Sequence, residues 1–165
     1  MRDDIDLQQR VQLLADSLLK TEHRVACAES CTGGWLAKVL TDLPGSSQWF
    51  ECGLVTYSNR SKQKLLGVPE AVLQQYGAVS GETVVAMVKG LLSRCDAQYG
   101  VSISGIAGPE GGSVSRPVGT VWIAWSQAAC EPLSRCFRFS GDREEVRREA
   151  VEVAIVGLID MVKNA

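Results

Sequence analysis

The sequence predicts a three-layer α/β/α fold with a mixed β-sheet, formed by residues 1–165 as a single domain. Segments of helical and of strand character alternate through the first two thirds of the chain, which is typical of a layered α/β fold. Two strand segments then follow each other with only a short loop between them, which predicts a neighbouring antiparallel pair. With 45% hydrophobic residues in 165, the chain can build one substantial core and has little material for a second.

Helices are predicted where apolar residues recur every three or four positions. Leu7, Val11, Leu14 and Leu18 form such a stripe near the N-terminus, and Ser80 can cap a helix that begins after it. The predicted helices cover residues 5–21, 35–43, 70–76, 81–95 and 142–163, and a polar turn at 58–62 leads into a helical turn that ends at Leu66.

Strands are predicted where apolar, aromatic and β-branched residues cluster. These segments are residues 25–28, 49–57, 99–104, 119–126 and 133–140. Glycine-rich loops follow several of them, and open α/β sheets place their ligand crevices in such loops. We therefore expect the functional site to be built from the loops that follow the strands.

Charge and hydropathy argue against nucleic acid and membrane partners. Seventeen Lys and Arg against nineteen Asp and Glu give a net charge of -2, so no extended basic surface is expected. The first ten residues mix acids and bases, and no run approaches the roughly 18 apolar residues that span a bilayer. We expect a cytoplasmic protein, and we expect its six cysteines to be reduced thiols rather than disulfides.

The single histidine, His23, cannot build a histidine-rich zinc site within one chain, and we expect neither a metal nor another cofactor. A Ser-His-Asp triad would have to use His23. The polar residues around His23 instead indicate a solvated loop residue. Cys31 is an alternative nucleophile, because a helix N-terminus would lower its pKa.

Two glycine-rich segments are candidate binding loops. Residues 28–34 read as a strand-to-helix turn whose backbone amides can approach an anion, although a tight turn capped by Thr32 fits equally. Residues 102–109 end a strand in small residues that suit a phosphate, a ribose or a developing oxyanion, or simply form a hairpin loop. The candidate substrate-binding residues in these segments are Glu29, Ser30, Thr32, Gly33, Gly34, Ser104, Gly105 and Gly108.

The start of the last predicted helix carries two arginines. Arg143 and Arg147 are four residues apart, share a helix face and could clamp a phosphate, unless they pair with neighbouring glutamates instead.

A lysine can act as the base for a serine nucleophile when burial lowers its pKa. Ser47 and Lys62 are one such combination, against the alternative of a surface serine and a solvated lysine. The strand predicted between them would separate its ends by roughly 26 Å. The pair therefore requires the chain to fold back or two subunits to share a site, which fits a homodimer without requiring one.

Seven motifs occur in order along the chain: AESCTGG at 28–34, PGSSQWF at 44–50, GLVTYSNRSKQKLLGV at 53–68, GAVS at 77–80, SGIAGPEGG at 104–112, PVGTVW at 117–122 and FSGDREEVR at 139–147. Together they resemble the CinA C-terminal domain family, and most closely its stand-alone amidase form, from about residue 7 to residue 163. The resemblance implies hydrolysis of nicotinamide mononucleotide to nicotinic acid mononucleotide and ammonia, a step in pyridine nucleotide recycling.

The resemblance also implies residue roles. It places a metal-free serine and lysine pair at Ser47 and Lys62, with Tyr57 beside them, while Ser104 contacts the substrate and Arg143 or Arg147 holds its phosphate. The alternative to this small-molecule hydrolase is a regulatory module whose glycine loops hold a pyridine nucleotide without chemistry.

Overall fold

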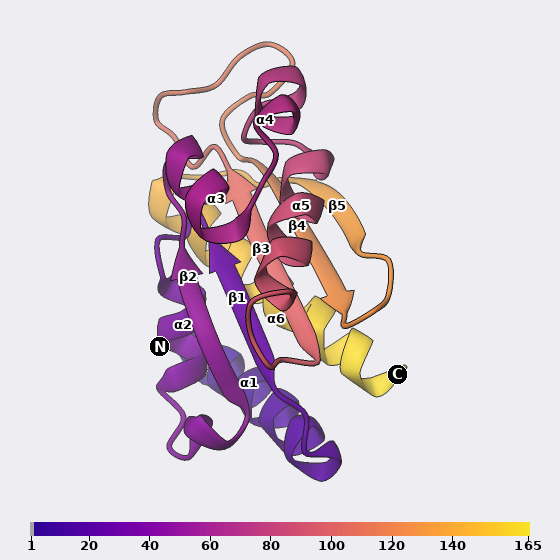
Figure 1. Ribbon diagram of the computed structural model, residues 1–165. Coiled ribbons are helices and arrows are strands. Elements are labelled where there is room, and N and C mark those ends of the chain that lie inside the picture. The colour runs from indigo at the N-terminus through magenta and orange to yellow at the C-terminus, as the bar shows by residue number, and fades with distance from the viewer. Residues whose placement is uncertain (1) are drawn as a thin grey trace.

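The computed structural model describes residues 2–165, with side chains described from residue 6 onward. Five strands form one sheet: β1 (Val25–Glu29), β2 (Phe50–Val55), β3 (Tyr99–Gly105), β4 (Thr120–Gln127) and β5 (Leu133–Arg138). Their order is β2-β1-β3-β4-β5 (Figure 1). β1 pairs in parallel with β2 and β3, whereas β3, β4 and β5 pair antiparallel. The predicted mixed sheet and the antiparallel β4–β5 pair are therefore confirmed.

Helices cover both faces of this sheet (Figure 1). One face carries α1 (Arg2–Thr21), α2 (Trp35–Thr41) and α6 (Arg143–Lys163), and the other carries α3 (Asn59–Leu66), α4 (Glu70–Tyr76) and α5 (Gly81–Leu92). Each side has its own apolar core, with Leu14 and Ile155 in the first and Leu73 and Met87 in the second. The predicted three-layer α/β/α architecture is confirmed.

β1 lies inside the sheet, between β2 and β3, and its first four residues are apolar without alternation. All five of its residues are buried, and successive side chains point to opposite faces. Val25 and Cys27 belong to the core under α1 and α6, whereas Ala26 and Ala28 belong to the core under α5. A strand buried on both faces needs no polar side, so a short apolar run is sufficient to predict it.

The polar residues at 58–62 are not the turn that the sequence predicted. Asn59 begins α3, and Ser58 caps it by accepting the N–H of Ser61, whose hydroxyl in turn accepts the N–H of Ser58. Such a capping box is built from polar residues, which is why this helix start resembles a turn in sequence. The correction places Lys62 on a helix.

Two further predictions concern the state of the cysteines and membrane-spanning segments. All six cysteines are free. Among the described residues, none of the helices combines the length and the apolar character needed to cross a bilayer.

Candidate active site

A pocket of about 260 Å³ lies at the edge of the sheet where β1, β2 and β3 have their carboxyl ends. Its wall is formed by Ser30, Cys31, Tyr57, Lys62, Ala78, Val79, Ser104, Gly105, Ile106, Ala107, Gly108, Glu110, Gly111 and Arg143. This is the edge at which parallel strands of α/β sheets present their ligand sites. A pocket thus lies among the loops where the sequence predicts the functional site; that it is the functional site stays a prediction.

Ser30 is the first residue after β1 and is fixed by the ends of both neighbouring strands. Its N–H donates to the carbonyl of Ile103 in β3 at 3.0 Å. The carbonyl of the preceding residue, Glu29, accepts the N–H of Thr56, just beyond β2, at 2.8 Å. The serine is thus held by the sheet itself rather than by a free loop.

Lys62 brings an amine to this serine. Its Nζ lies 2.9 Å from the Oγ of Ser30, and it also donates to the carbonyl oxygens of Thr56 at 2.8 Å and Tyr57 at 3.4 Å. The lysine side chain is 1% exposed. Burial lowers the pKa of Lys62 from its ordinary 10.5 to about 8, so about a tenth of the amine is neutral at pH 7, far more than for an exposed lysine.

The three partners of Nζ suit a lysine that works as a base. Carbonyl oxygens can only accept, so in the neutral amine the two N–H groups donate to Thr56 and Tyr57. The remaining lone pair then faces the hydroxyl of Ser30, which can donate its proton to it. The geometry thus places the Ser30 hydroxyl where a neutral Lys62 can accept its proton.

Glu29 builds the turn that follows Ser30. Its carboxylate is 1% exposed and accepts the backbone N–H groups of Gly34 at 3.1 Å, Leu36 at 3.1 Å and Ala37 at 2.8 Å. It thereby satisfies amides at the start of α2 that no helical carbonyl can reach. Gly34 adopts φ 95°, a conformation that favours glycine. Glu29 does not line the pocket, so its predicted contact with substrate has no support from this geometry.

Arg147 holds the other side of the same turn. Its guanidinium donates to the carbonyl oxygens of Cys31 and Thr32, both at 3.0 Å, and lies over the ring of Trp35 at 5.3 Å. Thr32 is fully buried and, like Gly33, stays outside the pocket wall. Arg147 thus binds the backbone of the turn that follows Ser30.

Arg143 reaches the pocket, whereas Arg147 does not. It donates to the carbonyl of Gly108 at 2.7 Å and to the hydroxyl of Tyr57 at 3.0 Å, and both residues line the pocket with it. Ser104, 1% exposed, donates its hydroxyl to the carbonyl of Ala78 at 2.7 Å and keeps its oxygen able to accept. A cation, a phenol and a hydroxyl therefore surround the Ser30–Lys62 pair.

Ser47 is not brought to Lys62 within one chain. It lies exposed in the short helix η1 (Ser46–Gln48), before β2 begins, and its carbonyl accepts from Arg24 at 3.0 Å. Lys62 lies beyond the opposite end of β2, whose six residues span about 20 Å. The structure thus leaves the Ser47–Lys62 pair to a site shared between subunits, which stays a prediction.

Neither alternative catalytic group gains support. Cys31 lines the pocket, but burial raises the pKa of its thiol to about 11, against the expectation that the helix N-terminus would lower it. His23 precedes β1 and packs on Tyr99 with ring centroids 5.6 Å apart, at the end of the strand opposite Ser30. Among residues 6–165, no three His, Cys, Asp or Glu side chains converge as a metal site would require.

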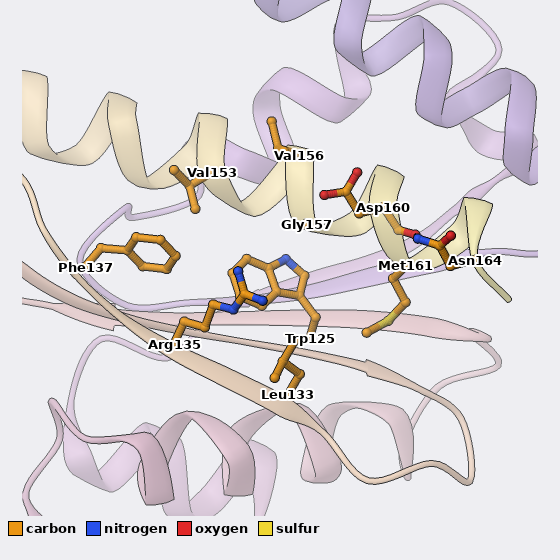
Figure 2. Close-up of a pocket in the computed structure, with 10 residues that line it drawn as sticks. All are labelled: Trp125, Leu133, Arg135, Phe137, Val153, Val156, Gly157, Asp160, Met161 and Asn164. Carbon is orange, nitrogen blue, oxygen red and sulfur yellow. The ribbon is translucent and has the colours of Figure 1, made fainter.

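A second, apolar hollow of about 400 Å³ lies between the β4–β5 hairpin and α6 (Figure 2). Trp125, Phe137, Val153 and Met161 gather there, and Figure 2 shows Asp160 at the α6 side of the hollow. The indole N–H of Trp125 is already donated to the carbonyl of Ala154 at 2.9 Å. No serine, cysteine or lysine lines this hollow, whereas the smaller pocket is lined by Ser30, Cys31 and Lys62.

The model of the CinA C-terminal domain family matches residues 7–162. The chain belongs to this family. Its relatives include the nicotinamide-nucleotide amidohydrolase PncC of Escherichia coli strain K12, 52% identical over 152 residues that cover 92% of each chain. The protein of the same name from Pseudomonas putida is 49% identical over 90% of this chain and 92% of its own.

The fold of this CinA C-terminal domain is also that of its solved relatives. The competence/damage inducible protein CihA of Agrobacterium tumefaciens superposes with a TM-score of 0.90 at 38% identity, covering 96% of this chain and 95% of its own. A competence damage-inducible protein of Klebsiella pneumoniae gives 0.91 at 34% identity, covering 95% and 97%. The arrangement of strands that builds the pocket is therefore a family property.

Proposed function

We propose that this protein hydrolyses the carboxamide of nicotinamide mononucleotide to give nicotinic acid mononucleotide and ammonia, as a step of pyridine nucleotide recycling. The observation that carries the proposal is the contact of the buried Lys62 amine with Ser30 Oγ, inside a pocket that also holds Arg143. The names of the relatives from E. coli and P. putida support the substrate class. A cytoplasmic homodimer remains part of the proposal.

We infer that Ser30, rather than Ser47, is the nucleophile. The neutral Lys62 accepts the proton of the Ser30 hydroxyl as Oγ attacks the carboxamide carbon, and backbone amides stabilise the oxyanion that forms. The protonated lysine then gives this proton to the leaving nitrogen, which departs as ammonia. An ester between Ser30 and the nicotinoyl group is left.

Water completes the reaction through the same pair. Lys62 accepts a proton from water as the oxygen attacks the ester carbon, and it returns that proton to Ser30 Oγ as the acid departs. The sum is one amide and one water consumed, one acid and one ammonia produced, with the serine and the neutral lysine regenerated. In this scheme Ser30, Lys62, backbone amides and water carry every step.

Arg143 is assigned to the phosphate, with Tyr57 as its hydrogen-bonded neighbour. Replacing Arg143 with Gln raises KM for the mononucleotide about 10-fold to 100-fold and changes kcat much less, because a charge-assisted contact distant from the reacting carbon contributes mainly to binding. Steady-state kinetics of ammonia release measures both constants. A fall in kcat at unchanged KM contradicts the assignment.

Ammonia and nicotinic acid mononucleotide, measured together after incubation with nicotinamide mononucleotide and a chelator, test the proposed reaction. We expect equal amounts of both products and rates unchanged by the chelator, because the proposed steps use only side chains and water. Nucleotide binding without release of either product would instead identify a binding module. Loss of activity with the chelator, restored by metal, would contradict the serine and lysine mechanism.

A further inference from the structure

Among the residues that line the pocket, Glu110 is the one acidic side chain, and Lys62 and Arg143 are the two basic ones. It lies on the exposed part of the connection between β3 and β4. No ion pair to its carboxylate forms within residues 6–165, the part of the chain whose side chains are described. Its negative charge is therefore not offset by an ion pair within these residues.

The connection that carries Glu110 is fastened to the domain on several sides. Arg143 donates to the carbonyl of Gly108 at 2.7 Å, and Arg116 donates to the carbonyl of Tyr76 at 2.6 Å. Gly111, next to Glu110, adopts φ 90°, which fixes the course of the chain at a position suited to glycine. These contacts fix the path of the connection on either side of Glu110.

A nicotinamide nucleotide carries two opposite charges that match this wall. Its phosphate is anionic, and its oxidised pyridine ring is a quaternary pyridinium cation. With the carboxamide at Ser30 and the phosphate at Arg143, Glu110 is the one acidic residue of the same wall that the ring can meet. The reduced nucleotide has the same carboxamide, ribose and phosphate but an uncharged dihydropyridine ring.

We propose that Glu110 is a specificity residue that recognises the positive charge of the pyridinium ring, so that the pocket prefers the oxidised mononucleotide to its reduced form. The inference rests on the proposed function for the orientation of the substrate. Its physical basis is the attraction between a fixed carboxylate and a cation in a partly enclosed site, which is weakened by salt.

The test compares Glu110→Gln with wild type, because glutamine keeps the shape and the accepting oxygen while removing the charge. KM and kcat are measured for nicotinamide mononucleotide, and the reduced mononucleotide is titrated as a competitive inhibitor to obtain Ki. The matched control is Glu144→Gln, an exposed acidic residue in the first turn of α6 that lies beside Arg143 but outside the pocket wall.

We expect Glu110→Gln to raise KM about threefold to fivefold at low salt, with kcat and the Ki of the reduced nucleotide changed less than about twofold. The control should leave all three constants near wild type. An unchanged KM overturns the inference. So does an equal rise in KM and Ki, because a lost ribose contact or a displaced loop would weaken both nucleotides alike.

Failure of the proposed function has a different signature from failure of this inference. If wild type releases no ammonia, calorimetric affinities of the oxidised and reduced mononucleotides for wild type and Glu110→Gln still decide the role of Glu110. A preference for the oxidised form that the variant loses supports it, and equal affinities in wild type overturn it.

Discussion

Replacing Ser30 with alanine lowers kcat for ammonia release about 10³-fold or more, with the fold retained. The Oγ of Ser30 is the serine hydroxyl that contacts Nζ of Lys62, so its removal leaves the base with no nucleophile to activate. A small side chain at the end of β1 remains compatible with the buried turn, since the N–H of residue 30 still donates to Ile103. Ammonia release at saturating nucleotide measures the loss, and the thermal unfolding midpoint verifies the fold.

Ser47→Ala is the matched control for this experiment. It removes a hydroxyl from an exposed residue on η1, at the other end of β2 from Lys62, so turnover should stay within about twofold of wild type. The opposite pattern, with Ser47→Ala inactive and Ser30→Ala active, would contradict the nucleophile assigned here. It would support a site in which Ser47 of one subunit meets Lys62 of another.

The Ser30–Lys62 contact lay within reach of sequence reasoning. Residues 25–55 read as a strand, a helix and a second strand, and consecutive parallel strands joined by a helix are commonly neighbours in the sheet. The residues that follow the two strands must then meet at the same edge, which brings Ser30 to the segment containing Lys62. Ser47 precedes its strand and belongs to the opposite edge. The family motif pointed to Ser47 and Lys62, whereas strand direction brings Ser30 to Lys62 within one chain.

Other features of the site could not be predicted from sequence. In sequence, Glu29 resembles a substrate-binding residue. In the structure its carboxylate accepts hydrogen bonds from three backbone amides of its own turn, and this role depends on the folded path of residues 30–37. Arg143 and Arg147 share a helix face, and only the position of that turn beneath α6 decides that Arg147 binds backbone while Arg143 reaches the pocket. Helix periodicity places side chains on a face but does not say what lies opposite them.

Replacing Lys62 with methionine abolishes turnover, with an expected loss of about 10³-fold or more in kcat, because methionine fills the buried space of the lysine side chain without supplying a base. In wild type, kcat/KM rises with pH, reaches half its maximum near pH 8 and levels above about pH 9, since burial lowers the pKa of Lys62 to about 8 and the neutral amine is the active form. A profile of kcat/KM from about pH 6 to pH 10 measures this dependence. A flat profile, or an active Lys62→Met protein, contradicts a lysine base.

The same lysine makes a prediction about stability that does not depend on the substrate. Its pKa is about 8 in the folded protein and 10.5 ordinarily, so between these values the unfolded chain binds one more proton than the folded one. The free energy of unfolding therefore rises with pH across this window, by about 1.4 kcal/mol per pH interval of one, and is insensitive to Lys62 below about pH 8. Denaturant unfolding of wild type and Lys62→Met at pH 7.5 and 9.5 measures the difference, which should shift by about 2 kcal/mol in favour of wild type. Parallel pH dependences in the two proteins would mean that Lys62 is charged in the fold, and a charged lysine could not take the proton from Ser30.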